Sequence, residues 1–223
     1  MKELASQMHH NFQFSIFNFP FNSFTMKNIL IITPMAAEQE NMLNALNNYP
    51  LPLLNAYTIR RGYVGKVYAA ASTALALAEE QFDLVAVIGY AAASDAYNTG
   101  DIVCPRFARY HDAHVPEGLD GVDFLTKPYA LEGTDDATVY TGDSFVGAEM
   151  IGEIKARFGT PKALFDMEAT AVCQIAAQQG LPAMVLKMVS DTPEKGCDAD
   201  AFERFVTEHT DFTPFVELLE KVQ

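Results

Sequence analysis

Four short runs of mainly apolar residues set the strongest limit on what this chain can fold into. They occupy residues 29–33, 84–88, 163–167 and 183–189. Apolar runs of this length are typical of strands that are buried on both faces, as in a parallel sheet. Segments with helical patterns separate them. We therefore expect an α/β fold of three layers, αβα, in which helices cover both faces of a central, twisted, mostly parallel or mixed sheet.

The residues between the runs complete this expected arrangement. Small residues predict a turn at 89–94, directly after the second run, and several glycines and prolines predict a loop over residues 115–134. A single strand is predicted over 101–108. The expected helices are 38–46, 66–80, 147–158, 168–179 and one or two more within 199–222, and further strands are expected at 57–61 and 138–141.

The length of 223 residues suits one domain, which we expect to comprise residues 26–223. Residues 1–25 differ from the rest, because their aromatic residues are interrupted by polar residues and by Pro20. This segment is too broken to span a bilayer and lacks the apolar core of a secretory signal. We expect a disordered extension or a start codon assigned too early; a packed or interface-forming arm is the alternative.

Charge and cysteine content narrow the classes of partner and the compartment. The formal net charge is −14. Nucleic-acid binding requires clusters of Lys and Arg, so this composition argues against a nucleic-acid partner. Cys104, Cys173 and Cys197 are an odd number without Cys-x-x-Cys spacing, which favours reduced thiols in a cytoplasmic protein over a disulfide framework.

Acidic residues follow three of the apolar runs. Glu38 comes after the first run, Glu168 after the third and Asp191 after the fourth. Because the carboxyl ends of strands line the ligand crevice of an open α/β sheet, we expect these three carboxylates to surround one sugar-sized site. Acids in such a crevice are candidates for binding and for proton transfer on a neutral, hydroxyl-rich or basic-nitrogen substrate.

Four sequence blocks carry a resemblance to a known family. They are residues 31–38, 65–89, 99–113 and 142–191, and the last contains the most specific signal, Met167-Glu168-Ala169-Thr170 followed about twenty residues later by Ser190-Asp191. With these blocks the chain resembles the nucleoside phosphorylase/hydrolase superfamily, and within it the 5′-methylthioadenosine/S-adenosylhomocysteine nucleosidases. The resemblance implies a nucleoside phosphorylase-like fold. It also implies hydrolysis of the N-glycosidic bond of a purine nucleoside, expected to be a 5′-substituted adenine nucleoside, with release of the free base and a ribose derivative.

The resemblance implies a role for each carboxylate. Asp191 is expected to donate a proton or a hydrogen bond to N7 of the purine, which makes the base a better leaving group, while Ser190 orients that side chain. Glu38 is expected to hold or deprotonate the attacking water, and a positioned base typically contributes about 10²–10⁴-fold. Glu168 is expected to accept hydrogen bonds from the ribose hydroxyls and to stabilise an oxocarbenium-like sugar.

The same resemblance implies which residues contact the substrate. Met167 is expected to pack on the sugar. Phe145 is expected to stack on the adenine, and the backbone of Val146 to read the edge of the base. Phe202, from a C-terminal helix, is expected to cap the pocket for the 5′ group.

Three positions depart from the pattern of the family. The turn after the second run reads Gly89-Tyr90-Ala91-Ala92, so Tyr90 and Ala91 are expected beside the sugar or the water, and Tyr90 brings a bulky side chain. Asp166 replaces a glutamate and is shorter by one methylene. Lys187 replaces an arginine.

Several of these residues have a simpler structural interpretation. An acid in the first turn of a helix is favoured by the helix dipole, which alone would explain Glu38. Asp166 fits a capping role better than a catalytic one. Core packing is a rival explanation for Phe145 and Phe202 in a chain with 16 phenylalanines.

Two further motifs favour other chemistry only weakly. His111, Asp112 and His114 lie close together, but on a strand-to-loop segment their spacing does not converge the rings on a metal, so we expect neither a metal nor an organic cofactor. Gly142-Asp143-Ser144 resembles the nucleophile block of some serine esterases. The only late histidine, His209, lacks the acidic partner that such an enzyme needs, which argues against a serine hydrolase.

Two other functions are compatible with the sequence. A phosphate-dependent nucleoside phosphorylase needs arginines to hold the anion; the turn at 33–35 offers none, but Arg60 and Arg61 keep this function open. A catalytically weak nucleoside-binding protein is the second alternative, because three positions depart from the family. By resemblance we also expect a homodimer, with residues 111–122 near the interface.

Overall fold

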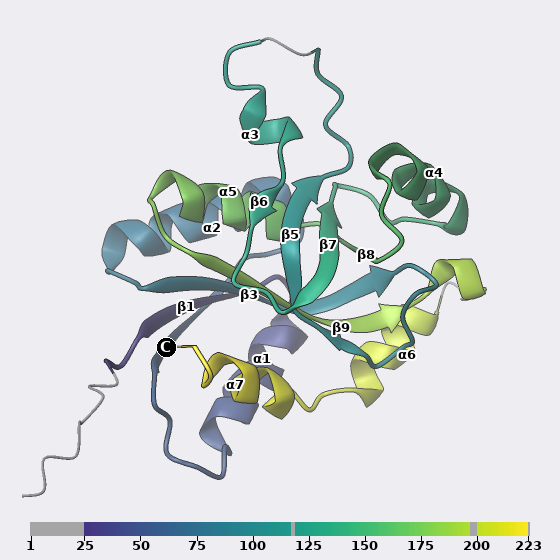
Figure 1. The fold of residues 1–223 in the computed structure, drawn as a ribbon. Helices are drawn as coiled ribbons and strands as arrows, with labels where there is room; N and C mark the ends of the chain where they lie inside the picture. The colour runs from purple at the N-terminus through teal and green to yellow at the C-terminus, as the bar shows by residue number, and fades with distance from the viewer. Residues whose placement is uncertain (1–24, 117–118, 197–199, 223) are drawn as a thin grey trace, which may run out of the picture.

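The computed structural model describes residues 25–116, 119–196 and 200–222, and one sheet runs through these residues (Figure 1). Its strands are β1 (Asn28–Thr33), β2 (Ala56–Arg61), β3 (Leu84–Ala93), β4 (Ile102–Val103), β5 (Pro105–Tyr110), β6 (Tyr129–Ala130), β7 (Asp135–Thr141), β8 (Ala163–Asp166) and β9 (Ala183–Asp191). Neighbouring strands follow the order β2-β1-β3-β8-β7-β5-β6, with β9 beside β3 and β4 beside β9.

Helices cover both faces of this sheet, which confirms the predicted three-layer α/β fold. One face carries α2 (Lys66–Glu79) and α5 (Ala169–Gln178), and the other carries α1 (Ala36–Asn47), α6 (Ala201–Glu208) and α7 (Thr213–Leu219) (Figure 1). The remaining helical segments are α4 (Ala148–Phe158), the short α3 (Asp123–Thr126) and a 3₁₀ turn at Pro193–Lys195.

Strand β3 changes partners along its length. It runs parallel to β9 on one side, and on its other side it runs parallel to β1 as far as Val87, which lies opposite Ile32. Ala92 and Ala93 then pair with β8 in the antiparallel sense. The sheet is therefore mixed, and the middle of β3 lies in the gap between the carboxyl ends of β1 and β8.

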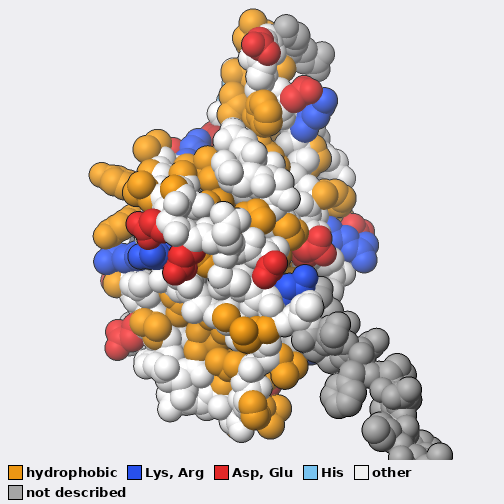
Figure 2. Space-filling model, turned by 90° about the vertical axis from the view of Figure 1, so that its left-hand side faces the viewer, with side chains coloured by type: hydrophobic (Ala, Val, Ile, Leu, Met, Phe, Trp, Pro, Cys, Tyr) orange, Lys and Arg blue, Asp and Glu red, His pale blue; other side chains and the backbone are white. Residues whose placement is uncertain are grey.

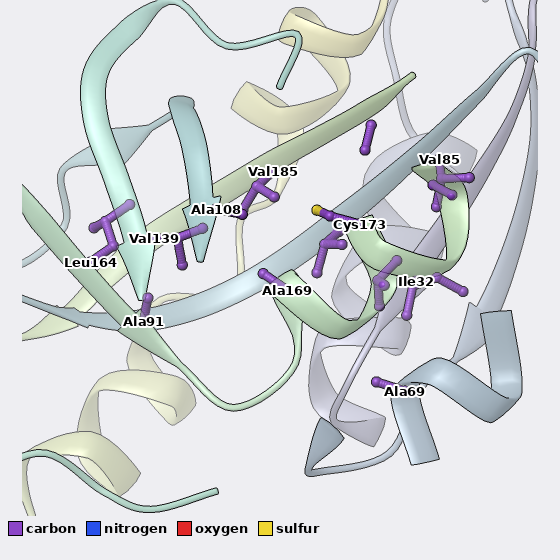
Figure 3. Packing of buried hydrophobic residues seen from close by; sticks show 14 of the residues in the cluster. Ile32, Ala69, Val85, Ala91, Ala108, Val139, Leu164, Ala169, Cys173 and Val185 are labelled. Carbon is purple, nitrogen blue, oxygen red and sulfur yellow. The ribbon is translucent and has the colours of Figure 1, made fainter. Parts of the chain in front are cut away.

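Alternation along the strands divides the core into two main layers. Val85 and Val87 of β3 face the helices α2 and α5, whereas Leu84 and Ile88 face α1 and α7. Figure 3 shows the first layer, in which small side chains such as Ala69 of α2 let the helices pack closely on the strands. Because fully burying one such aliphatic side chain contributes about 1.5–3 kcal/mol, these layers hold the strand ends in fixed positions.

Three predicted boundaries differ from the structure. The strand expected at 84–88 continues through the predicted turn, because Ala92 and Ala93 find a partner in β8. The strand expected over 101–108 is two strands, β4 on β9 and β5 on β7. The loop expected at 115–134 contains α3 and β6. The predicted N-terminal extension, residues 1–25, lies outside the described residues except for Thr25.

Candidate active site

Two backbone amides hold Glu38 where β1 passes into α1. Its Oε2 accepts a hydrogen bond from the N–H of Met35 at 2.7 Å, and its Oε1 accepts one from the N–H of Tyr90 at 2.8 Å. The side chain is only 2% exposed. Burial raises the pKa of Glu38, although Lys187 and the two amides favour its charged form. The carboxylate is therefore fixed in direction and has an increased affinity for a proton.

The glycine at position 89 is explained by its distance from Glu38. A Cβ atom added to Gly89 would lie 2.2 Å from Oε1 of Glu38. A real Cβ never approaches an oxygen that closely, so any other residue would displace the carboxylate. The absence of a side chain at Gly89 of β3 therefore leaves the space that the carboxylate of Glu38 occupies.

Glu168 immediately precedes α5 and lies two residues after the end of β8. Its Oε1 accepts a hydrogen bond from the N–H of Gly65 at 2.8 Å, and its Oε2 accepts one from the N–H of Met167 at 3.2 Å. The residue is 5% exposed. Burial and, next, the charge of Asp166 raise the pKa of Glu168 to about 7. Near neutral pH this carboxyl group therefore exists in both protonation states.

An ion pair between Lys187 and Asp166 lies beneath the two glutamates. Lys187 is completely buried, and its Nζ lies 2.9 Å from Oδ2 of Asp166. Asp166 also accepts hydrogen bonds from the hydroxyl of Thr141 at 2.6 Å and from the N–H of Ala169 at 3.0 Å. The capping role predicted for Asp166 is thus present, since Ala169 opens α5. The ion pair itself joins β8 to β9.

Lys187 is the shared countercharge of three acids. Burial alone would lower its pKa, but Asp166, Glu38 and Glu168 outweigh burial and raise it, so the ammonium stays charged. Asp166 lies within contact distance of Nζ, which has three N–H groups to donate. The ammonium therefore keeps capacity to donate. The sequence showed Lys187 and Asp166 only as two separate departures, because their contact joins strands that are distant along the chain.

Asp191 lies at the carboxyl end of β9, opposite Ala92 of β3. Its Oδ1 accepts a hydrogen bond from the hydroxyl of Ser190 at 2.6 Å. The side chain is half-buried. Burial raises the pKa of Asp191, while the bond from Ser190 opposes the rise. Asp191 is four residues beyond Lys187 on the same strand, roughly 13 Å further along it, so it lies past the buried cluster rather than inside it.

The structure brings together two aromatic residues expected at the substrate. Phe145 follows β7 and is 83% exposed, so core packing does not explain it. Its ring contacts that of Phe202 on α6, with centroids 6.4 Å apart in an edge-to-face arrangement. Phe202 is half-buried against the layer under α1, and Val146 against the residues of α4. Met167 is half-buried between the two acids, whereas Ala91 is buried in the layer under α2 and α5.

Tyr90 lies differently from the sequence expectation. Its side chain, expected beside the sugar or the water, packs instead between Phe205 and Phe212. Only its backbone N–H reaches Glu38. The reason is the alternation of a strand: Gly89 faces Glu38, so the next residue of β3 points to the opposite face of the sheet.

A second ionic network fixes the backbone that supports Glu168. The Nζ of Lys66 lies 2.6 Å from Oδ2 of Asp112, and the N–H of Lys66 donates to Asp143 at 2.9 Å. The N–H of Asp143 in turn donates to Asp112 at 3.1 Å. These bonds tie the start of α2 to the segments after β5 and β7. They thereby hold the N–H of Gly65 in place for Glu168.

Two further features of the described residues concern metal binding and a cavity outside the carboxylate cluster. No group of three or more His, Cys, Asp and Glu side chains there is placed to hold a metal ion. A cavity of about 480 Å³ lies between α1 and β2, away from every predicted site residue. It is lined by Gln39, Leu43, Leu46, Asn47, Leu53, Asn55, Ala56, Tyr57 and Ile59.

Comparison with protein families decides the relationship that the site suggests. The profile of the phosphorylase superfamily matches residues 54–214, which include Glu168, Lys187 and Asp191. The chain belongs to this superfamily. The resemblance drawn from the sequence is thereby confirmed.

Related proteins of this superfamily carry a more specific name. A 5′-methylthioadenosine/S-adenosylhomocysteine nucleosidase of Staphylococcus saprophyticus is 31% identical over 170 residues, which cover 64% of this chain and 71% of that protein. The protein of the same name from Staphylococcus aureus is 29% identical over 169 residues, covering 66% of this chain and 73% of the relative. Within the superfamily, the chain is therefore similar to these nucleosidases.

Solved structures of nucleosidases share the fold. The enzyme of Streptococcus pneumoniae, solved with a transition-state inhibitor, superposes with a TM-score of 0.71 at 24% identity, covering 86% of this chain and 97% of that one. The enzyme of Neisseria meningitidis, solved with methylthio-immucillin-A, gives a TM-score of 0.72 at 21% identity, covering 88% and 100%. The predicted nucleoside phosphorylase-like fold is confirmed.

Proposed function

We propose that this protein is an N-glycosyl hydrolase that splits a 5′-substituted adenine nucleoside into adenine and a 5-substituted ribose. The observation that carries the proposal is the buried cluster in which Glu38 and Glu168 share the charge of Lys187. It occurs in a chain whose relatives are named 5′-methylthioadenosine/S-adenosylhomocysteine nucleosidases. Substrate, reaction and site are all supported by these two facts together.

The buried cluster suits the sugar half of the reaction. As the bond from C1′ to N9 breaks, its electron pair leaves with the purine and positive charge builds on the ribose. Glu168, held by two backbone amides, accepts hydrogen bonds from the ribose hydroxyls and stabilises that charge. Glu38 takes a proton from the water whose oxygen bonds to C1′, and its raised pKa makes it a stronger base. Lys187 favours the charged form of both carboxylates.

Asp191 suits the base half of the reaction. In the proposal the ribose lies at the cluster, and the purine lies on the side toward Asp191, at the carboxyl end of β9. A carboxyl group with a raised pKa keeps its proton more readily near neutral pH. Asp191 donates that proton to N7 of the departing purine, and Ser190 holds the carboxyl group in direction. Together, one proton goes to the base and one comes from the water, so the reaction balances.

The remaining predicted residues form the walls of this site in the proposal. Phe145 is exposed and free to stack on adenine, and the backbone of Val146 lies next to it. Met167 lies between Asp166 and Glu168, where a sugar would pack. Phe202 touches Phe145 and closes the end at which the 5′ group lies. Tyr90 contributes its backbone N–H, which donates to Glu38, and Ala91 follows it in β3.

Phosphorolysis is the second candidate, and the placement of its two arginines disfavours it. Arg60 is paired with Glu79 at 2.5 Å, and the guanidinium of Arg61 lies 4.6 Å from the centre of the Tyr63 ring. Both residues are engaged at the exposed end of β2. The cation beside Glu38 is Lys187, which already faces Asp166, so a phosphate there would meet three carboxylates.

Release of adenine in the presence and absence of phosphate tests the proposal. We expect adenine from 5′-methylthioadenosine or S-adenosylhomocysteine without phosphate, and less base from inosine. Glu38→Gln should lose turnover, while Glu40→Gln, an exposed acid on the same helix, should keep it. If base release depended strictly on phosphate, the protein would be a phosphorylase and not a hydrolase. Tight binding without any free base would show a nucleoside-binding protein instead.

We also propose that the protein forms a homodimer, as its resemblance implied. An apolar strip of exposed side chains runs over the start of α2 and along it: Tyr63, Val64, Val67, Tyr68 and Leu75 are each more than half exposed. Hydrophobic side chains reach the surface on the face that Figure 2 shows, between the charged ones. Large exposed apolar patches mark interaction sites. Sedimentation of the purified protein should give twice the mass of one chain, and a monomer at micromolar concentration would contradict this.

The extent of the domain and the compartment complete the proposal. We propose that residues 26–223 form one domain, which the continuous sheet from β2 to β6 supports. A cytoplasmic location is supported by Cys104 and Cys173, which are both buried free thiols. None of the helices that the structure describes has the length and apolar character needed to cross a bilayer. Limited proteolysis should leave one fragment from near residue 26 to the C-terminus.

A further inference from the structure

The side chain of Tyr90 joins three segments on the α1 side of the sheet. Its hydroxyl donates a hydrogen bond to the carbonyl of His209 at 2.7 Å and accepts one from the side-chain N–H of Asn41 at 3.0 Å. Its ring meets Phe205 and Phe212 edge to face, with centroids 5.8 and 5.4 Å away. Burial raises the pKa of Tyr90 to about 12, so the hydroxyl keeps the proton that it donates.

The same residue also contacts Glu38. The N–H of Tyr90 donates to Oε1 of Glu38 at 2.8 Å, and Asn41 lies one turn after Glu38 on α1. Tyr90 therefore contacts the proposed water-activating acid through its backbone and the end of α6, at His209, through its side chain. Glu38 and Asn41 both belong to α1, so one helix contacts both the backbone and the side chain of Tyr90.

Helix α6 depends on such contacts for its position. It has eight residues, and a helix that short is not stable on its own. Its C-terminal end is held by Tyr90, and the ring of Phe205 is stacked on that of His209 with centroids 3.8 Å apart. Phe202 lies one turn before Phe205 and so projects from nearly the same face of the helix. The place of Phe202 is thus set by the place of the turn that Tyr90 anchors.

We propose that Tyr90 is a positioning residue that seats α6 on β3 and thereby fixes how much room Phe202 leaves for the 5′ substituent of the nucleoside. This inference rests on the proposed function. It assigns to the aromatic ring and hydroxyl of Tyr90 a part in substrate selection, although neither touches substrate. A firmly seated α6 favours an apolar 5′ group, such as methylthio, over the small polar hydroxyl of adenosine.

The variant Tyr90→Phe tests the proposal, because it removes the hydroxyl and keeps the ring. We expect the KM for 5′-methylthioadenosine to rise about five- to tenfold, the size of one or two lost neutral hydrogen bonds, with a smaller change in kcat. For adenosine, which has only a hydroxyl at the 5′ carbon, the change in KM should be less than about twofold. The ratio of kcat/KM between the two substrates should therefore fall.

Tyr57→Phe is the matched control. The hydroxyl of Tyr57 bonds to Glu220 and so ties β2 to the segment after α7, away from the carboxylates. Its loss should lower the melting temperature by a similar amount and leave the substrate ratio unchanged. If both variants change the ratio equally, or if Tyr90→Phe changes neither KM, the proposal is overturned.

Hydrogen exchange provides a readout that needs no activity. In Tyr90→Phe the amides of residues 202–209 should exchange faster than in the wild type, while those of α7 stay protected; unchanged exchange would overturn the anchoring. If the wild type releases no base, the proposed function fails but this measurement still decides the anchoring. Should Tyr90→Phe not fold, Asn41→Ser, which removes one of the two hydroxyl contacts, should show the same changes at a smaller size, and its absence of effect would count against the proposal.

Discussion

The buried carboxylates and the terminal one are held in opposite ways. Glu38 and Glu168 each accept two backbone hydrogen bonds, are almost fully buried and share the charge of Lys187. Asp191 is half-buried and accepts one hydrogen bond, from the hydroxyl of Ser190. The first pair is fixed in direction and the last acid has fewer constraints.

This difference matches what each group is proposed to do. A carboxylate that stabilises developing positive charge works best when it does not need to reorient, and backbone amides provide that rigidity. A carboxyl group that delivers a proton needs a raised pKa, which Asp191 obtains from burial without a nearby cation. The comparison teaches that the two acids that share the cation Lys187 are held rigidly by backbone amides, whereas Asp191 is held by the hydroxyl of Ser190.

Removing the ammonium group of Lys187 should destabilise the buried cluster of Asp166, Glu38 and Glu168. At pH 8, Lys187→Met leaves Asp166, Glu38 and Glu168 without a countercharge. We expect the free energy of unfolding to fall by about 3–5 kcal/mol, as when one partner of a buried ion pair is removed. Urea denaturation followed by circular dichroism measures this change.

The control for that experiment is another lysine in an ion pair. Lys155 bonds to Asp95 and Glu194 near the surface. Lys155→Met should cost only about 0–1 kcal/mol. Equal losses for the two variants would show that the cluster around Lys187 is solvated.

Removing the proton donor should separate binding from turnover. Asp191→Asn cannot protonate the purine, so we expect turnover of 5′-methylthioadenosine to fall by about 10²–10⁴-fold. The dissociation constant, measured by calorimetry, should change only a few-fold. Asp211→Asn, at an exposed acid that bonds the N–H of Thr213, should leave both unchanged. Unaltered turnover in Asp191→Asn would remove this residue from its role.

A single methyl group should disturb the buried half without changing any charge. In Gly89→Ala the new Cβ falls on the carboxylate of Glu38. We expect a loss of about 1–3 kcal/mol in the free energy of unfolding, as for overpacking, together with a fall in kcat. Gly152→Ala, in the middle of α4 with open space around it, should instead stabilise by about 0.5–1 kcal/mol. A harmless Gly89→Ala would mean that Glu38 moves freely.

The smallest effect that we predict is a change in how the free energy of unfolding depends on pH. The pKa of Glu168 rises from 4.5 to about 7 on folding, so between these values the folded state binds more protons than the unfolded chain. Stability from this group is complete below about pH 4.5 and is lost as the pH rises through about 7. Glu168→Gln should therefore flatten the decline in the free energy of unfolding, by at most about 1.4 kcal/mol per pH unit.

An acid with the opposite shift is the control for the pH experiment. Burial alone would raise the pKa of Asp112, but hydrogen bonds from Lys66 and from the N–H of Asp143 lower it. Its contribution is present above its ordinary value and is lost only as the pH falls through the lowered one. Asp112→Asn should leave the slope between pH 5 and 7.5 unchanged. An equal change of slope in both variants would contradict the raised pKa of Glu168.

Much of the fold followed from the sequence, because apolar runs determine which segments become buried strands. The runs at 29–33, 84–88 and 183–189 lie in strands of the sheet, and the run at 163–167 does so except for Met167, which follows β8. The acids at their ends were correctly placed at strand exits. What sequence reasoning lacked was contact information: the bond from Gly65 to Glu168 spans 103 residues, and nothing local in either segment indicates it.

The difference between the expected and the observed position of the Tyr90 side chain has a specific cause. Ending the second strand at Ile88 turned Gly89 and Tyr90 into a loop, where no rule fixes the direction of a side chain. In the structure β3 continues to Ala93, and strict alternation puts Gly89 toward Glu38 and Tyr90 away from it. Small residues after an apolar run are therefore ambiguous, since they serve a turn and a close approach equally well.

The unequal lengths of β1 and β3 have a consequence for how this site could change. Beyond Val87 a longer β1 would pair with the amide of Tyr90, but β1 stops and Glu38 accepts that hydrogen bond in its place. The carboxylate thus takes the place of the backbone carbonyl that a longer β1 would provide. Lengthening β1 by a residue or two would supply a backbone acceptor for this amide and release Glu38. The length of one strand, as much as the identity of any acid, therefore determines where a general base can be held.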